Sequence, residues 1–439
     1  MKYCIIIPDG GADLPIESLG GPDDAGRTPL EAAKLPNIAR VAAMGRVGCA
    51  VTTPPGFEAG SDVCSMCLLG YDPAKYHTGR APLEAAAIGI DPGLSDWIFR
   101  LNLVTTGDGE GRFPGPRMLD HSAGAITDGE ARQLVADLVA HWKKTVPDAA
   151  EGFTLTPGVS YRNILVDASG ADYRALQTTP PHAIPGQPWR EHLPEGPGSD
   201  RLRALMESGA AFLPAHDINQ ARVDAGLRPA TMPWIWGQGT RPTMPPFESA
   251  YGLRGAIITA VDLLAGIAAY IGWDRLVVKG MTSYHDTDYA AQGRATCDAL
   301  DQYDVVCCHV EAPDEASHQG DAATKLASLE AIDTHIVGPV LEKLRTFGEP
   351  GAEPGANNAG WRLLIMPDHY TLVSTKKHDA TPVPFVVAGT LIRSLVQRPF
   401  TEKAALESDL RIEPGHELME YFLYSALRHA PGRPRGGRS

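Results

Sequence analysis

Three strand-like apolar runs of the sequence each end in acidic residues or histidine. The runs are residues 3–7, 303–308 and 361–366. The polar residues that follow them include Asp9, Asp314, Asp368 and His369. Runs of this length and composition are typical of buried parallel strands, and ligands of an open α/β sheet bind beyond the carboxyl ends of its strands. The sequence therefore predicts an α/β fold with these polar side chains gathered at one edge of a central sheet.

Two further histidines extend this polar set. His318 lies four residues after Asp314, so the two side chains share a face if the segment is helical, and His378 follows His369 by nine residues. An isolated Asp-x-x-x-His pair is more often a helix cap beside a surface histidine, but the similar pattern at three strand ends favours a metal site. Carboxylate and imidazole groups suit divalent transition metals such as Zn²⁺ or Mn²⁺. Their number exceeds the needs of one ion and fits a two-metal phosphoryl-transfer centre.

Ser61 is the candidate nucleophile of such a centre. It follows Gly60 and precedes an apolar run, residues 63–69. On its own, a serine in this position is more often a helix N-cap. A serine at a helix N-terminus is also well placed to receive a phosphoryl group, because backbone N–H groups and the helix dipole stabilise the anion.

Two arginines are candidate substrate clamps. Arg80 lies between Gly79 and a predicted helix start, where it either binds a phosphate or carboxylate with two hydrogen bonds or pairs with Glu84. Arg162 lies in a predicted strand, residues 158–166. Both arginines are expected to orient the organic part of a phosphorylated substrate.

Composition narrows the expected partners and compartment. The 439 residues carry a formal net charge of −14, which argues against nonspecific binding to nucleic acid or acidic membranes. No run approaches the roughly 18 apolar residues of a membrane span, and the N-terminus enters a predicted strand without signal-peptide features. No Gly-rich loop indicates ATP or NAD. We expect a cytoplasmic enzyme with a small phosphorylated substrate and no nucleic-acid or membrane partner, in an oligomeric state that the sequence does not fix.

The pattern of strands and helices changes at two points. Residues 1–100 and 251–405 have an α/β pattern and are expected to form one discontinuous core domain. Residues 101–250 have long Pro- and Gly-rich stretches and are expected to form an inserted domain, whereas the tail, 429–439, is expected to be disordered. The expected helices include residues 29–44, 63–69, 128–141, 199–208, 256–271, 289–300 and 321–346. The other expected strands include residues 46–51, 99–105, 158–166, 276–278 and 383–387.

Short motifs between the N-terminus and about residue 400 occur in a familiar order. They are Pro8-Asp9-Gly10, Gly60–Val63, Leu68–Pro73, Thr78–Ala85, Pro157–Arg162, Trp234–Gly239, His309–Asp314 and Pro367–His369. In this order they resemble the archaeal-type branch of the cofactor-independent phosphoglycerate mutases, in the alkaline phosphatase superfamily. The resemblance implies an alkaline-phosphatase-like core, with a central, mostly parallel sheet flanked by helices. It also implies a smaller inserted α+β domain that covers the substrate and excludes water.

The resemblance further implies roles for individual residues. The implied ligands of one metal ion are Asp9, Ser61, Asp368 and His369, and those of the other are Asp314, His318 and His378. The two divalent ions are expected to be Mn²⁺ or Zn²⁺, with Mg²⁺ and Co²⁺ as alternatives. Ser61 is implied to become a phosphoserine while the enzyme interconverts 3-phosphoglycerate and 2-phosphoglycerate in glycolysis.

Four sites in the part expected to bind substrate depart from the family pattern. Gln292 replaces a usual Lys, Ala125 a usual His and Ala183 a usual Asp, and Cys64-Ser65 replaces a usual Ala-Asn. Loss of a Lys that neutralises phosphate should weaken anion binding in a water-excluded site. These departures leave open an alternative in which the same two-metal chemistry serves another substrate, as a homoserine-kinase-like phosphotransferase or a phosphatase. A catalytically degenerate binding protein is a third alternative, against which the complete set of predicted ligands argues.

Overall fold

A computed structural model describes residues 1–20, 26–108, 116–349, 359–394 and 396–425. The predicted tail, 429–439, lies outside the described residues. The chain divides into two compact units. Unit 1 is Met1–His77 with Thr243–Ser439, and unit 2 is Thr78–Pro242. Among the described helices, none combines the length and the apolar character needed to cross a membrane.

The boundaries of the two units lie at residues 77/78 and 242/243, whereas the predicted ones lay near residues 100 and 250. The first boundary falls earlier because helix α5 (Arg80–Ala87) packs against strands of unit 2. Its buried alanines form a hydrophobic cluster with strand residues: Ala81, Ala85, Ile98, Ile164 and Val166. The pattern of residues 78–100 alone gives no sign of which unit buries this helix.

Unit 1 contains an eight-stranded sheet in the order β15-β2-β14-β11-β1-β10-β8-β9. The strands are β15 (Arg411–Ile412), β2 (Arg46–Ala50), β14 (Val383–Gly389), β11 (Trp361–Ile365), β1 (Lys2–Pro8), β10 (Val305–Val310), β8 (Gly255–Ile258) and β9 (Asp274–Arg275). Only β14 runs antiparallel to its neighbours in this sheet. Strand β1 pairs in parallel with both β10 and β11, so the carboxyl ends of these three strands meet at one edge. The predicted α/β fold with a central, mostly parallel sheet is therefore confirmed.

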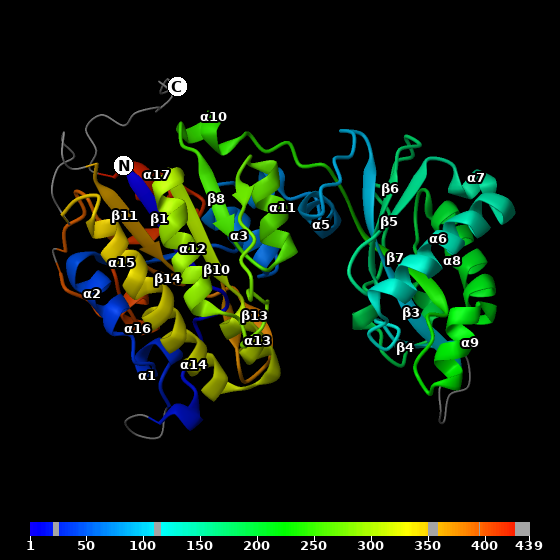
Figure 1. Ribbon diagram of the computed structural model, residues 1–439, viewed down its shortest axis with the longest axis horizontal. Helices are drawn as coiled ribbons and strands as arrows, with labels where there is room; N and C mark the ends of the chain where they lie inside the picture. The colour runs from blue at the N-terminus through cyan, green and yellow to red at the C-terminus, as the bar shows by residue number, and fades with distance from the viewer. Residues whose placement is uncertain (21–25, 109–115, 350–358, 395, 426–439) are drawn as a thin grey trace. The chain divides into compact units, whose positions relative to one another are not determined.

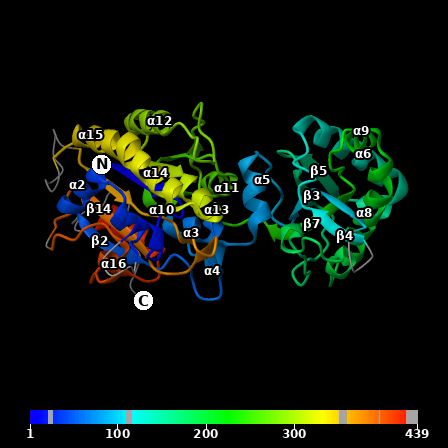
Figure 2. The same ribbon diagram turned by 90° about the horizontal axis from the view of Figure 1, so that it is seen from below.

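One large hydrophobic cluster joins this sheet to its helices. Its strand residues are buried, among them Ile6, Val306 and Leu363. The helices that complete it include α2 (Pro36–Met44), α12 (Tyr289–Gln302), α14 (Ala322–Ile332) and α15 (Gly338–Arg345). Figures 1 and 2 show α14 and α15 following one another along the sheet, with α12 packed beside α15. Burial on both sides explains why the strands read as continuous apolar runs rather than alternating ones.

The structure corrects several of the expected elements. Residues 256–271 form strand β8 and then helix α11 (Asp262–Tyr270), because a short apolar run cannot be told from a buried helix by periodicity. Residues 276–278 are not a strand, since β9 ends at Arg275 and Val277 is 83% exposed. Strand β10 ends at Val310 rather than at residue 308. The expected helices 29–44 and 321–346 are each interrupted, the first between α1 (Pro29–Ala32) and α2 and the second by a π-helical turn, Asp333–Val337.

Unit 2 is built on an antiparallel sheet in the order β4-β3-β6-β5, with β7 paired to β3. Its strands are β3 (Trp97–Asp108), β4 (Pro116–Asp120), β5 (Phe153–Pro157), β6 (Arg162–Asp167) and β7 (Met232–Thr240). Helices α6 (Asp128–Thr145) and α8 (Ser199–Phe212) pack on one another and share a hydrophobic cluster with β3 and β7. Strand β5 was not expected, and the predicted strand 158–166 begins only at Arg162.

A buried ion pair ties α14 to the loops at the edge of the unit 1 sheet. Lys325 is fully buried, and its Nζ donates to Asp13 Oδ2 at 3.0 Å. The same Nζ donates to the carbonyls of Ala12 at 3.2 Å and Thr371 at 2.8 Å. Since a buried ammonium must be paired and hydrogen-bonded, these contacts hold the segments after β1 and β11 against α14.

Glu402 is a buried carboxyl that should make the stability of unit 1 depend on pH. Its Oε1 accepts hydrogen bonds from the N–H groups of Asp13 and Leu30, and burial raises its pKa from 4.5 to about 7. The folded chain therefore binds this proton more tightly than the unfolded chain. The resulting stability is complete below pH 4.5 and is lost as the pH rises to about 7. The pKa difference is worth at most about 3 kcal/mol.

We predict that Glu402→Gln, which cannot ionise, becomes more stable relative to wild type as the pH rises from about 4.5 to 7. Urea unfolding at about pH 5, 6, 7 and 8 measures this difference. Glu407→Gln, at an exposed position just after the same helix, is the control and should show no such trend. Parallel stability curves for wild type and Glu402→Gln would contradict the assignment.

Candidate metal centre and its serine

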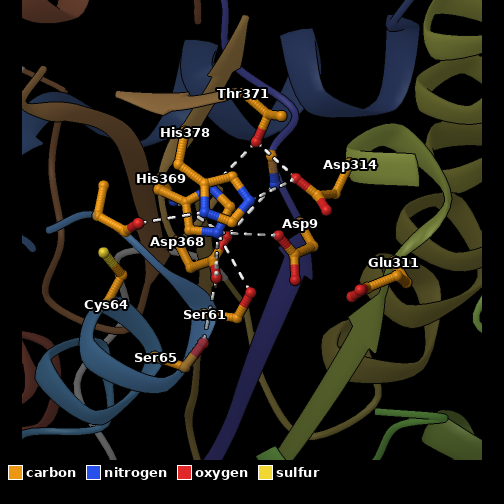
Figure 3. Close-up of polar contacts among 12 residues, drawn as sticks. Asp9, Ser61, Cys64, Ser65, Glu311, Asp314, Asp368, His369, Thr371 and His378 are labelled. Atoms are coloured by element: carbon orange, nitrogen blue, oxygen red, sulfur yellow. Dashed lines mark hydrogen bonds and ion pairs between the residues drawn. The ribbon is translucent and has the colours of Figure 1, made fainter. Parts of the chain in front are cut away.

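The predicted ligands meet at the carboxyl edge of the unit 1 sheet, as Figure 3 shows for most of them. Asp9 directly follows β1, and Ser61 is the first residue of helix α3 (Ser61–Leu68). Asp314 and His318 lie on helix α13 (Ala312–Gln319) after β10. The remaining three follow β11: Asp368, His369 and, in strand β13 (Lys377–Asp379), His378. Segments that are far apart in sequence thus supply one polar cluster.

The first group of possible ligands is Asp9, Asp368 and His369, all fully buried. His369 Nε2 lies 3.5 Å from Asp9 Oδ1 and 3.4 Å from Asp368 Oδ2. Ser61 Oγ lies 3.2 Å from the same nitrogen. Asp9 Oδ1 has no hydrogen-bond partner among the described residues, although a buried carboxylate oxygen ordinarily has one. A cation beside Ser61 would satisfy this oxygen.

The second group is Asp314, His318 and His378. His318 Nε2 lies 3.1 Å from Asp314 Oδ2, and His378 Nε2 lies 3.5 Å from Asp314 Oδ1. The two imidazole nitrogens are themselves only 3.0 Å apart. The hydrogen bond to Asp314 raises the pKa of His318 to about 9, so in the absence of a metal a proton takes the place of the cation. Two imidazoles and a carboxylate that converge in this way fit one divalent metal ion.

Hydrogen bonds outside the two groups fix the ring orientations. His318 Nδ1 lies 3.0 Å from the carbonyl of Lys376, and His378 Nδ1 lies 3.1 Å from that of Ala59. Since a carbonyl only accepts, each Nδ1 carries the hydrogen and each Nε2 faces the centre. Metal-binding histidines ordinarily show this arrangement.

Thr371 fixes the orientation of both the His369 ring and the Asp314 carboxylate. Its hydroxyl donates to Asp314 Oδ1 at 2.6 Å and lies 3.1 Å from His369 Nδ1, from which it accepts. His369 Nε2 therefore also faces the centre. Thr371 is thus shared by a residue of each group, and it belongs to neither predicted ligand set.

Gly10 allows these segments to approach closely. It has a φ of +57°, and a Cβ at this position would lie 2.5 Å from Thr371 Oγ1 and 2.6 Å from Asp314 Oδ1. Its N–H donates to Asp368 Oδ1 at 3.3 Å. Both the backbone conformation and the space require glycine here.

Some residues of this centre were not predicted from the sequence. They include His309, Glu311, Ser65 and Thr371. Ser65 Oγ donates to Asp368 Oδ2 at 3.2 Å, and His309 Nε2 lies 2.8 Å from Asp9 Oδ2. His309 and Glu311 could have been found, because they directly follow the predicted strand 303–308, but only Asp314 and His318 of that segment were taken as ligands. Thr371 gave no signal, and Ser65 was noted only as a departure from the family pattern, since their contacts depend on chain segments that meet only in the fold.

The candidate arginines lie in unit 2, and the structure excludes the alternative pairing of Arg80 with Glu84. Glu84 instead pairs with the buried Arg100, at 2.9 Å. Burial lowers the pKa of Arg100 to about 10; Glu84 opposes this shift, and the charges of Arg80 and Arg162 add to it. These three arginines therefore form one cationic cluster. The described residues provide no ion pair for Arg80 or Arg162.

The departures from the family pattern occupy different environments. Gln292 is buried in unit 1, where its Oε1 accepts from Thr287 and its Nε2 donates to the His309 carbonyl at 3.3 Å. Its amide is therefore engaged on both sides within the protein. Ala125 and Ala183 are exposed in unit 2.

We predict that Thr371→Val weakens binding of Mn²⁺ by about 10- to 100-fold, because His369 and Asp314 both lose a hydrogen bond that orients them. Titration of the metal-free protein with Mn²⁺ measures the change. Thr296→Val is the matched control, since this buried threonine donates instead to the backbone of Gln292. Unchanged affinity in Thr371→Val would show that the two ligands hold their positions without the hydroxyl.

Comparison with known proteins gives a consistent result. A family model described as 2,3-bisphosphoglycerate-independent phosphoglycerate mutase matches residues 42–219. A relative of that name from Methanothrix thermoacetophila is 42% identical over 96% of this chain and 100% of its own length. A second, from Methanothermobacter thermautotrophicus, is 40% identical over 98% of each chain. A probable enzyme of this kind from Geobacter sulfurreducens is 38% identical over 96% of this chain and all of its own.

Two solved structures share the fold. A protein from Pyrococcus horikoshii is 24% identical, with a TM-score of 0.75 over 96% of each chain. A cofactor-independent phosphoglycerate mutase from Thermoplasma acidophilum is 23% identical, with a TM-score of 0.62 over 96% of this chain and 99% of its own.

Proposed function

This chain belongs to the 2,3-bisphosphoglycerate-independent phosphoglycerate mutases, and we propose that Ser61 is the residue through which it transfers the phosphoryl group. Its activity is that of a phosphoglycerate mutase, which interconverts 3-phosphoglycerate and 2-phosphoglycerate. The relatives carry mutase names, so we do not adopt the alternatives suggested by the departures, a homoserine-kinase-like phosphotransferase, a phosphatase or a degenerate binding protein.

The observation that carries the proposal is the position of Ser61 beside the first ligand group. Its Oγ lies 3.2 Å from His369 Nε2, at the amino end of α3. The positive end of the helix dipole stabilises a phosphate bound at this serine. Its side chain is buried, which favours electrostatic stabilisation over exchange with water.

The proposed reaction has two halves that balance. In the first, a bond forms between Ser61 Oγ and phosphorus while the bond from phosphorus to the substrate oxygen breaks. The serine hydroxyl loses its proton, and the departing substrate oxygen gains one. In the second, the neighbouring hydroxyl of the retained glycerate loses a proton and takes the phosphoryl group, and the Ser61 hydroxyl is restored.

We assign two divalent ions to the two groups described above. One would be held by Asp9, Ser61, Asp368 and His369, and the other by Asp314, His318 and His378. When bound, such ions lower the pKa of a hydroxyl group and neutralise charge on the attacking and leaving oxygens. Mn²⁺ and Zn²⁺ are the proposed ions, and Mg²⁺ or Co²⁺ also accept this ligand set.

We further propose that unit 1 is an alkaline-phosphatase-like core and unit 2 the substrate-covering domain. The mostly parallel sheet of unit 1, with its ligands at the strand ends, supports the first assignment. The antiparallel sheet and helices of unit 2 support its description as an inserted α+β domain. Arg80 and Arg162 are the proposed clamps, because they belong to a cationic cluster with Arg100 and, unlike Arg100, form no ion pair with an acidic side chain among the described residues.

The decisive experiment is a coupled assay of the conversion of 3-phosphoglycerate to 2-phosphoglycerate with added Mn²⁺. We predict that Ser61→Ala lowers turnover by at least about 10³-fold, because it removes the nucleophile. Ser328→Ala, at a buried serine that contacts Tyr289, is the matched control and should retain activity. If Ser61 releases phosphate from a generic phosphoester but the protein shows no mutase turnover, the role of Ser61 stands and phosphoglycerate is not the substrate. No turnover of either compound, with no bound metal, would overturn the catalytic proposal.

We predict that Arg162→Met and Arg80→Met each lower kcat/KM by about 10- to 100-fold, the cost of one or two charge-assisted hydrogen bonds. Steady-state kinetics over a range of 3-phosphoglycerate concentrations measures the effect. Arg174→Met is the control, because this exposed arginine of unit 2 already pairs with Asp172. If kcat/KM of both variants equals that of Arg174→Met, Arg80 and Arg162 do not bind the substrate.

A further inference from the structure

The two carboxylate oxygens of Asp9 face different groups. Oδ1 lies 3.5 Å from His369 Nε2, in the first ligand group. Oδ2 lies 2.8 Å from His309 Nε2, in a separate group that also contains Glu311. A carboxylate that presents one oxygen to each of two groups is suited to bridge two cations.

His309 has the environment of a metal-binding histidine. It is buried near the end of β10, and its Nδ1 lies 3.0 Å from Thr259 Oγ1. That oxygen also accepts from the N–H of Val261 at 3.0 Å, and a hydroxyl oxygen can accept two hydrogen bonds. Nδ1 can therefore donate to Thr259, so that the lone pair of Nε2, which lies 2.8 Å from Asp9 Oδ2, can face a cation.

Glu311 supplies a carboxylate with one oxygen that lacks a hydrogen-bond partner among the described residues. It immediately precedes α13, and Figure 3 shows its carboxylate pointing toward Asp9. Its Oε2 is buried, lies 3.6 Å from His309 Nε2 and has no hydrogen-bond partner among the described residues. The separation is too long for a hydrogen bond. It is close to the roughly 3 to 3.5 Å between neighbouring ligand atoms around an ion with bonds near 2.1 Å.

Cationic side chains do not balance this group. No lysine or arginine of the described residues forms an ion pair with Asp9 or Glu311. The nearby Gln292 donates from a neutral amide to the His309 carbonyl. Asp9 Oδ2 and the buried Glu311 Oε2 therefore face the same group without a lysine or arginine partner among the described side chains, an arrangement that a bound cation would stabilise.

We propose that Asp9, His309 and Glu311 hold a third divalent cation, with Asp9 as the ligand shared with the first group. Ligand atoms of the three residues lie within 4.8 Å of one another. This proposal shares one residue, Asp9, with the proposed metal centre, and it does not depend on which substrate the enzyme uses. Two carboxylates and one imidazole suit a small divalent ion of the Mg²⁺ or Mn²⁺ class, and Mn²⁺ is the probe.

The test is the number of Mn²⁺ ions bound per full-length chain. Metal-free protein is dialysed against Mn²⁺ raised to about 1 mM, the weak end of the range for oxygen-rich protein sites, and its metal content is measured by elemental analysis. We predict that wild type binds three ions and that Glu311→Gln and His309→Asn each bind one fewer. A wild-type maximum of two overturns the proposal, and so do three ions in both variants.

Two control variants assign the lost ion. Asp314→Asn should lose binding in the second group while retaining the ion at Glu311. Glu342→Gln, at an exposed residue on α15, should match wild type. The count needs no substrate, so a chain that binds three ions without mutase turnover would support this site and contradict the proposed function. A protein that has mutase turnover but binds only two ions would support the proposed function and contradict the third site.

Discussion

The structure of unit 1 depends on the burial of several carboxylates at one edge of its sheet. Strand β1 lies between β10 and β11, so the residues that follow these three strands must share a small volume. The acidic residues gathered there are Asp9, Glu311, Asp314 and Asp368. Because a buried charge is stable only when it is paired or bound to metal, the sheet topology itself creates a demand for cations. The surrounding histidines present Nε2 atoms that can bind such cations.

A second layer of contacts holds this arrangement in place. Lys325 neutralises Asp13 and fixes the Ala12 and Thr371 carbonyls, so it anchors the segments that carry Asp9 and His369 without entering the centre. Thr371 then connects His369 to Asp314 through one hydroxyl. The geometry of the candidate ligands therefore depends on residues outside the candidate metal groups.

The sequence predicted the ligand-bearing strand ends because buried parallel strands leave a local signal, an apolar run that stops at polar residues. It failed where the signal is ambiguous or absent. Residues 256–258 were assigned to a helix because an apolar run has no period. His309 was missed because only Asp314 and His318 were taken as ligands from the polar residues after the predicted strand 303–308. Thr371 and the Ala59 carbonyl act only through segments brought together by folding. The fold, and the residues that the structure gathers as candidate ligands, were thus within reach of sequence reasoning, and the contacts that support them were not.

The same electrostatics links metal binding to folding. An ion that binds only the native state stabilises it by RT ln(1 + [L]/Kd), and the carboxylates of unit 1 come together only in the fold. The candidate metal groups found among the described residues all lie in unit 1, whereas the core of unit 2 is a hydrophobic cluster around β3 and β7. Chelation should therefore lower the stability of unit 1 more than that of unit 2.

Gln292 is consistent with a role of bound cations in balancing the buried carboxylates. Its amide is neutral and donates to the carbonyl of His309, so it adds no positive charge beside this strand.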